Sequence, residues 1–139
     1  RLSFFPARDL PLRSDIVLSA ETTAEQARSV AAASGQPWLF VVDKDRRPIG
    51  WIGSAGLAGE EGPRPLGTMG VIGYGHGFTV STDSLRAALD AAVLSPAGGA
   101  VGVDTDGTVI GVVTQSDLGA AIWPLGDAGG VLAATSDNG

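Results

Sequence analysis

A chain of 139 residues, of which 44% are hydrophobic and 17% charged, is long and apolar enough to bury one compact core or two small ones. Its net charge of −6, with only nine Lys and Arg residues, argues against nonspecific binding to nucleic acid or to an anionic membrane surface. The absence of cysteine excludes disulfides, thiolate catalysis and cysteine-ligated metal. No apolar run approaches the roughly 20 residues of a membrane-spanning helix, so we expect no direct membrane insertion. The chain begins at Arg1, and we expect it to be a fragment of a longer polypeptide.

One segment of the sequence recurs. Residues 43–50, DKDRRPIG, align with residues 104–111, DTDGTVIG, so that Gly50 falls on Gly111. The two copies are therefore 61 residues apart (111 − 50), a spacing called the repeat offset below. The alignment at this offset extends without a gap over residues 23–57 of the first copy. One residue slips before this stretch, where we match Glu21 with Asp83. The sequence therefore predicts two copies of one unit.

The first copy is predicted to fold in the order β-α-β-β-α. A cluster of Ser, Thr and Glu that can cap a helix precedes an alanine-rich run. A continuous apolar run follows, as in a strand buried on both faces. The predicted elements are an extended piece at 16–18, a helix led by 19–23 and ending at Ala33, strands at 38–42 and 48–52 around a turn at 43–46, and a short helix at 54–58.

The second copy repeats this order. Its turn ends in Asp106-Gly107, and glycine supplies the positive φ that a tight hairpin needs. The predicted elements are an extended piece at 78–80, a helix led by 81–83 and ending near Leu94, strands at 100–103 and 108–113 around a turn at 104–107, and a helix at 114–122.

Neither copy has enough residues to cover its own sheet, so the two should pack together about a pseudo-twofold axis. The predicted fold class is α/β, with two β-α-β-β-α repeats. We expect peripheral segments at both ends. The predicted division is an N-terminal connector at 1–13, the first repeat at 14–59, a linker at 60–76, the second repeat at 77–123 and a C-terminal tail at 124–139.

The most informative motif lies where the last predicted strand enters the last helix. After Gly111, the chain reads Thr114-x-x-Asp117, which places both side chains at the start of a helix. One interpretation is a capping box that satisfies free helix amides. The other is a binding site, in which Asp117 accepts hydrogen bonds from two sugar hydroxyls while Thr114 and backbone amides meet polar ligand atoms.

The duplicated unit, closed by G-x-x-x-T-x-x-D, resembles the CBS domain in its tandem form, the Bateman module. The resemblance covers roughly Asp9 to Ile122. It implies that Asp117 binds the ribose of an adenine nucleotide such as AMP or ATP, or of an adenosine derivative, and that Thr114 contacts the ribose or a phosphate. The residues that it implies for the adenine pocket are Phe78, Thr79, Val80, Val112 and Val113.

The first repeat departs from this pattern. At the repeat offset, Gly53 stands for Thr114 and Gly56 for Asp117. A glycine has no side chain that could bind a ribose, so we expect a degenerate site in this copy. In the second copy, Arg86 is the obvious basic residue for a phosphate. The pair is therefore expected to have one competent site or none.

Other candidates for chemistry have little support. His76 is the only histidine and lies in the glycine-rich linker. The Asp-x-Asp turns at 43–45 and 104–106 lack the glutamate of a calcium loop, and Ser54 and Ser116 lack a base partner. We interpret the three tryptophans as core or interface residues. The protein is therefore predicted to be regulatory and not an enzyme, without a metal site.

Residues 1–10 resemble the connector that follows the ATPase domain in ATP-binding subunits of glycine betaine/carnitine/choline ABC importers. This resemblance implies that the chain is cytoplasmic and membrane-associated through its host transporter, with the ABC ATPase domain and a membrane permease as partners. It also implies osmotic gating and, as a further ligand, cyclic di-AMP. We also expect a homodimer, formed through the Ala-rich faces of the helices at 24–33 and 85–94. The alternative function is a structural dimerisation module without a bound nucleotide.

Overall fold

The computed structural model of the chain describes residues 4–128. It contains two three-stranded sheets in the orders β1-β2-β3 and β4-β5-β6. The first repeat comprises β1 (Val17–Ser19), α1 (Ala24–Ser34), β2 (Trp38–Val42), β3 (Pro48–Gly53) and the 3-10 helix η3 (Ser54–Leu57). The second comprises β4 (Gly77–Thr79), α2 (Leu85–Val93), β5 (Ala100–Val103), β6 (Val109–Val113) and α3 (Gln115–Ala128). This is the predicted α/β class with the predicted element order.

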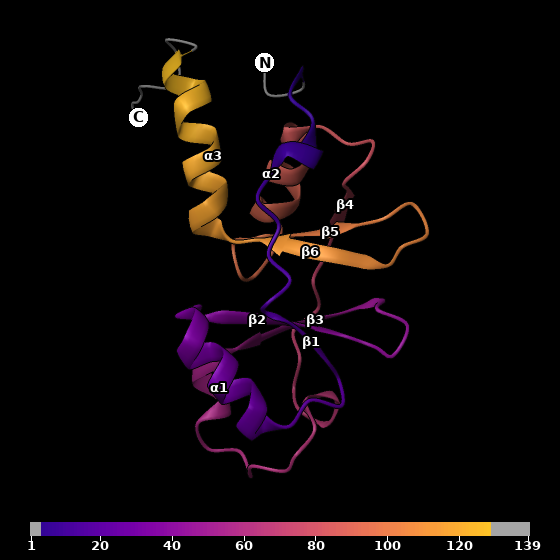
Figure 1. Cartoon of the computed structure of the whole chain (residues 1–139), viewed down its shortest axis with the longest axis vertical. Coiled ribbons are helices and arrows are strands. Elements are labelled where there is room, and N and C mark those ends of the chain that lie inside the picture. Colours follow the sequence, from indigo (N-terminus) through magenta and orange to yellow (C-terminus); the bar gives the residue numbers. More distant parts are fainter. Residues whose placement is uncertain (1–3, 129–139) are drawn as a thin grey trace.

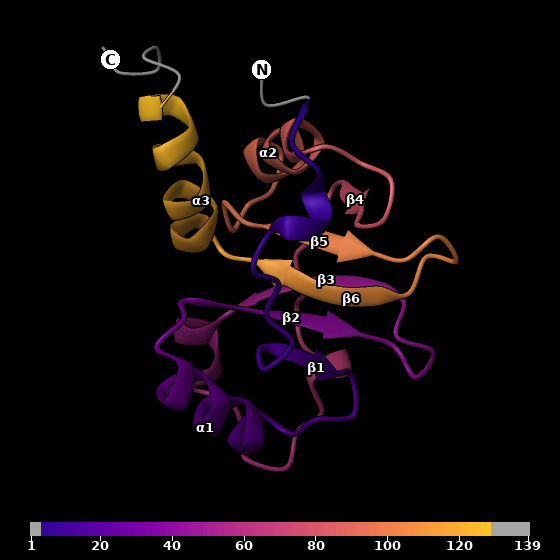
Figure 2. The ribbon, with the colours of Figure 1, turned by 45° about the horizontal axis from the view of Figure 1, so that its top comes forward.

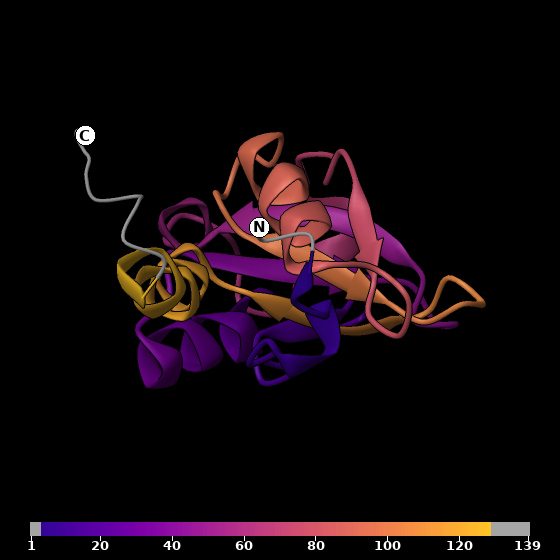
Figure 3. The ribbon, with the colours of Figure 1, turned by 90° about the horizontal axis from the view of Figure 1, so that it is seen from above.

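The two sheets lie in the middle of the molecule, with α1 outside one of them and α2 and α3 outside the other (Figure 1). Their strands overlap when the molecule is seen from above (Figure 3). In each sheet the first pair of strands is parallel and the second pair is antiparallel. A register shift falls at Val41/Val42 and again at Gly102/Val103, two places that the repeat offset matches. The repeat is therefore present in the hydrogen-bonded ladder as well as in the sequence.

The first strand of each repeat departs from the repeat offset. Val17 pairs with Phe40, and Gly77 pairs with Val101, so Val17 of β1 corresponds to Gly77 of β4 and not to Phe78. The one-residue slip is present, but the expected match of Glu21 with Asp83 is wrong in direction. The second repeat has one more residue between strand and helix, and the Asp83 carboxylate there accepts a hydrogen bond of 2.6 Å from the backbone N–H of Thr79.

The boundaries of α1 follow the local chemistry of the sequence, whereas the cap of α2 lies one residue after the predicted leading segment 81–83. Thr23 and Gln26 form a reciprocal capping box at the start of α1, and Gly35 ends this helix in the left-handed conformation. Ser84 caps α2. The last helix of the first repeat is only the 3-10 helix η3, because Gly56 and Gly59 follow Ser54 closely and glycine disfavours a longer helix.

Each repeat is completed by the segment that precedes the other one. The connector carries the 3-10 helix η2 (Ala7–Asp9) and packs against the second repeat, where Arg13 and Val112 exchange backbone hydrogen bonds of 2.7 and 2.9 Å. The linker carries η4 (Leu66–Thr68) and packs against the first repeat, where Ile72 and Trp51 exchange bonds of 2.7 and 2.8 Å. Figure 1 shows the indigo connector running past the second sheet before it enters the first.

The connector is therefore not peripheral where the structure describes it. Ala7 is fully buried and Leu10 is 8% exposed, both in the core of the second repeat. Residues 1–3 lie outside the described part of the chain, as do residues 129–139 of the expected tail. Residues 124–128 of that tail belong to α3.

The repeated glycines Gly50 and Gly111 allow these crossings. A Cβ at Gly50 would collide with the carbonyl oxygen of Ile72, and a Cβ at Gly111 would lie 2.8 Å from the carbonyl oxygen of Arg13. The crossing backbone thus occupies the space of a side chain at both positions. This explains why the glycine recurs at the end of the repeated segment.

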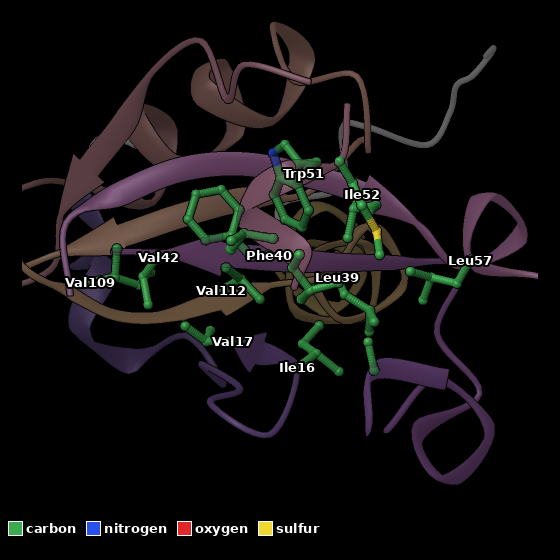
Figure 4. Close-up of a cluster of buried hydrophobic side chains, with 14 of the residues drawn as sticks. Ile16, Val17, Leu39, Phe40, Val42, Trp51, Ile52, Leu57, Val109 and Val112 are labelled. Atoms are coloured by element: carbon green, nitrogen blue, oxygen red, sulfur yellow. The ribbon is translucent and has the colours of Figure 1, made fainter. Parts of the chain in front are cut away.

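The larger core cluster joins the two repeats. It combines residues of β2 and β3 with Val101, Val109 and Val112 of the second sheet. Figure 4 shows Val109 and Val112 beside Val42 and Phe40, and the ring of Phe40 meets Trp51 edge-on at 4.9 Å between centroids. Burial of these side chains between the sheets holds the pair together.

The two hairpin turns project from the same side of the molecule (Figure 2) and contact each other. The backbone N–H of Val109 donates to the carbonyl of Arg46 at 2.8 Å, and Nε of Arg46 donates to the carbonyl of Val109 at 3.1 Å. Nη1 of Arg47 donates to the carbonyl of Asp106 at 2.9 Å. Arg46 has φ 59°, in the place where the second repeat has Gly107 at φ 87°. Its contacts across the interface offset the strain of this conformation.

Within residues 4–128, no helix is long and apolar enough to cross a membrane.

Gly50→Ala should lower the free energy of unfolding by about 1–3 kcal/mol, because the new methyl group displaces the linker backbone at Ile72. Urea denaturation measures this change. Gly56→Ala is the matched control, since its Cβ would meet nothing within 4 Å, and it should change stability by less than about 0.5 kcal/mol. Equal effects of the two substitutions would contradict the crossing argument.

Candidate functional site

The predicted Thr114-x-x-Asp117 motif lies at the start of α3, where β6 ends. Thr114 is 9% exposed, and its Oγ1 accepts a hydrogen bond of 3.0 Å from the backbone N–H of Asp117. The threonine therefore caps the helix, which is one half of the predicted capping box, while the reciprocal bond to the Asp117 side chain is absent among the described residues. The Asp117 side chain is half-buried, and its carboxylate forms no hydrogen bond with any residue that the structure describes. Its acceptor oxygens remain for another partner.

The connector places a cation within electrostatic range of this carboxylate. Arg13 binds Asp15 through Nε at 3.1 Å and Nη2 at 2.8 Å. These bonds, and more weakly the charge of Asp117, raise the pKa of Arg13 above its usual value. The same bonds lower the pKa of Asp15, so the carboxylate stays charged to lower pH than a free aspartate.

Arg13 was missed by the sequence analysis, which named Arg86 instead. Arg86 lies on α2, where its side chain is 57% exposed and forms an ion pair of 3.5 Å with Asp90. Arg13 and Asp117 lie near opposite ends of the chain, and only the crossing of the connector brings the two together. No local signal in the sequence could have identified it.

A cavity of about 170 Å³ lies beside Thr114, between the two repeats. The lining is mostly apolar and aromatic. It consists of Ile16, Gln36, Pro37, Trp38 and Trp51 from the first repeat, and of Ala97, Gly99, Thr114, Gln115 and Ser116 from the second. The cavity adjoins the first turn of α3, and Ile16 follows closely after Arg13 along the chain.

Two tryptophans give this cavity its chemistry. Trp38 is half-buried, and Trp51 is 2% exposed. The Nε1–H of Trp51 is buried and has no hydrogen-bond partner among the described residues. A buried donor without a partner is costly.

The two repeats differ at the cavity by an exchange of small and large residues. Trp38 pairs with Gly53 across β2 and β3, and a Cβ at Gly53 would lie 3.7 Å from the Trp38 ring. At the repeat offset, these positions become Gly99 and Thr114. In the first repeat the indole therefore covers the place where the second repeat presents a hydroxyl. The match of Trp38 with Gly99 was readable in the sequence and was missed.

The first repeat also lacks a counterpart of Asp117 and of Arg13. Gly56 stands for Asp117 and is exposed. Ile72, which bridges to Trp51 as Arg13 bridges to Val112, stands for Arg13. The first repeat thus lacks the hydroxyl, the carboxylate and the cation together.

The predicted adenine pocket is only partly accessible. Phe78 is 1% exposed, and Val112 and Val113 are fully buried. All three pack into the core clusters, so they present no surface to a ligand in this conformation. Thr79 and Val80 are half-buried. The structure brings Thr114 and Asp117 together at the start of α3, whereas the side chains of Phe78, Val112 and Val113 are buried in the core.

A second, larger hollow lies between α2 and α3. It has a volume of about 610 Å³, and none of the described residues that line it is charged. Val93 is 76% exposed and Trp123 is 68% exposed at this groove. The lining residues are Trp38, Leu89, Ala92, Val93, Ser95, Pro96, Ala97, Gly98, Gln115, Leu118, Gly119, Ile122 and Trp123.

The described part of the chain holds no group of side chains that could bind a metal ion together. No cluster of three His, Asp or Glu residues is present there. His76 is exposed in the linker. The Asp43 and Asp106 carboxylates accept hydrogen bonds from their own turns, as the turn interpretation predicted.

Thr114→Val should lower the free energy of unfolding by about 1 kcal/mol, because valine keeps the shape but removes the oxygen that accepts from the Asp117 N–H. Thr114→Ser should keep most of the stability, since serine also caps helices. Chemical denaturation of both variants checks this. A valine variant as stable as the wild type would show that the cap contributes nothing.

The sequence matches no protein-family model, and no curated protein matches it significantly. Solved structures do resemble the fold. CBSX2, a CBS-pair protein of Arabidopsis thaliana, has a TM-score of 0.70 at 16% identity, over 88% of this chain and 97% of that one. The CBS pair of a putative Mg²⁺ transporter from Shewanella oneidensis has a TM-score of 0.63 at 22% identity, over 84% of this chain and 67% of that one.

A structure of CBSX2 in complex with AMP is also similar, with a TM-score of 0.65 at 17% identity, over 87% of this chain and 98% of that one. At such identities the likeness shows the fold alone. The two sheets, the reciprocal crossings and these neighbours together establish that the chain has the fold of a tandem CBS-domain pair.

Proposed function

We propose that the chain is a regulatory module that binds an adenine nucleotide or adenosine derivative at the second repeat. The observation that carries this proposal is the Asp117 carboxylate. It is half-buried, free of hydrogen bonds within the described residues, and anchored one helical turn from the cavity at Thr114. A ribose presents two neighbouring hydroxyl donors, which an ionised carboxylate can accept together.

The cavity beside Thr114 suits a planar heteroaromatic base. Trp38, which is half-buried, supplies a flat aromatic surface for stacking. Trp51, whose buried Nε1–H has no partner among the described residues, also lines the cavity. This assigns the base to the cavity between the repeats instead of to Phe78, Val112 and Val113, which the structure buries in the core. Thr79 and Val80 remain as flanking candidates.

AMP is the first ligand to test, because a neighbour with this fold is known in complex with it. ATP and cyclic di-AMP are further candidates. A regulatory role is favoured over catalysis, since the described site contains an acceptor, a cation and aromatic surfaces but no nucleophile paired with a base.

The connector also suggests the larger protein to which this module belongs. Residues 1–10 resemble the connector after the ATPase domain of glycine betaine/carnitine/choline importers, so we assign the pair to gating such a cytoplasmic ATPase and its permease. Because the connector packs on the second repeat through Ala7 and Arg13, a ligand at Asp117 would act on the segment that enters the pair.

A second candidate is a dimerisation module, favoured by the groove between α2 and α3. The Ala-rich faces named for this role are largely used internally, since Ala24, Ala27, Ala88 and Ala91 are buried in their own repeats. Two copies of a chain with net charge −6 repel each other, so they should meet through an uncharged surface. The uncharged groove with Val93 and Trp123 at its surface meets this requirement, and we propose a second copy as its occupant.

Asp117→Ala should weaken AMP binding about tenfold to a hundredfold, as expected for the loss of one or two charge-assisted hydrogen bonds. Isothermal titration calorimetry measures the change. Gly56→Ala, at the equivalent position of the first repeat, should leave the affinity unchanged. Equal affinities of Asp117→Ala and the wild type would mean that the motif only caps α3.

Val93→Glu should convert the dimer to a monomer, because it buries a charge in an apolar contact. Light scattering coupled to size exclusion measures the mass at high micromolar concentration. Phe4→Glu is the control, since it adds the same charge at a side chain that is 87% exposed and lies outside the groove. A wild-type monomer at that concentration would reject the dimer.

A further inference from the structure

The connector supplies a residue to the site of the second repeat. Arg13 is fixed by two backbone hydrogen bonds to Val112, two residues before Thr114 on the chain that enters α3. In an antiparallel bridge, directly opposed residues project from the same face. Arg13 therefore lies on the same face of the ladder as Val112, beside the strand that leads to Thr114 and Asp117. Its guanidinium lies within electrostatic range of the Asp117 carboxylate.

The guanidinium is oriented but not saturated. Asp15 takes up Nε and Nη2, while Nη1 donates to no acceptor within residues 4–128. The Arg13 side chain is 27% exposed, so a ligand can reach it. An arginine held by one carboxylate in this way presents its remaining N–H groups in a fixed direction.

The charge around Asp117 limits what this arginine can bind. Residues 77–123 contain one Lys or Arg, Arg86, which is paired with Asp90 on α2. One arginine therefore faces two carboxylates, those of Asp15 and Asp117. Such a group can anchor a single phosphate through charge-assisted hydrogen bonds. It cannot balance the charge of a triphosphate.

We infer that Arg13 anchors the phosphate of a nucleoside monophosphate whose ribose is bound by Asp117, so that the site prefers one phosphate over none and over three. This inference rests on the proposed function and extends it. It assigns part of the second-repeat site to the connector, outside the repeat itself.

Calorimetric titration with AMP, adenosine and ATP tests the inference. The wild type should bind AMP about tenfold more tightly than adenosine, as one charge-assisted hydrogen bond implies. It should also bind AMP more tightly than ATP. Arg13→Gln should abolish the preference for AMP over adenosine while leaving adenosine affinity within about twofold. Arg86→Gln is the matched control and should keep the preference.

Two further measurements distinguish an effect of the Arg13 charge from an effect on the folding of the site. Arg13→Lys should retain part of the preference, because the positive charge remains. Added salt should reduce the preference in the wild type but not the affinity for adenosine. Unchanged adenosine binding shows that the site of each variant is folded.

The possible failures are distinguishable. An unchanged preference in Arg13→Gln, or tighter binding of ATP than of AMP by the wild type, overturns the inference and leaves the proposed function standing. Loss of adenosine binding in Arg13→Gln also overturns it, since the arginine would then shape the site and not anchor a phosphate. A wild type that binds neither AMP nor adenosine overturns the proposed function, and the inference with it.

Discussion

The structure depends on a reciprocal crossing of backbone over two glycines. The linker crosses β3 of the first repeat at Gly50, and the connector crosses β6 of the second at Gly111. Each crossing makes two backbone hydrogen bonds and leaves no room for a Cβ. Since each repeat is completed by the segment that precedes the other, neither sheet has its full set of edge hydrogen bonds alone. The pair is therefore one folding unit rather than two joined halves.

This crossing also makes the two halves unequal in function. The same backbone geometry delivers Arg13 to the second repeat and Ile72 to the first. The exchange of Trp38 and Gly53 for Gly99 and Thr114 adds to the difference. A duplicated fold has thus kept its ladder and its core on both sides while concentrating polar groups on one. In the proposed complex, a ligand bound by Asp117 would also contact Arg13 of the connector and Trp38 of the first repeat, which lie far from it in the sequence.

The two repeats also differ in the surface that they expose, because their last helices differ in length. On the side of α2 and α3 the second repeat exposes Val93 and Trp123 around an uncharged groove. The first repeat has only the short helix η3 in place of α3, and Arg28 of α1 caps it by donating to the carbonyls of Leu57 and Glu60. The longer helix α3 of the second repeat thus forms one wall of this groove.

The sequence by itself determined what depends on neighbours along the chain. The repeat offset, the hairpin turns, the cap at Thr23 and the position of Thr114 and Asp117 at a helix start follow from periodicity and local hydrogen bonding, and the structure has them all. The tertiary structure alone decided the rest. It buried Phe78, Val112 and Val113, which composition could not distinguish from pocket residues, and it moved the connector from the periphery into the core. It brought Arg13 to Asp117, because a contact between distant segments depends on how the two sheets pack, and no local pattern records that.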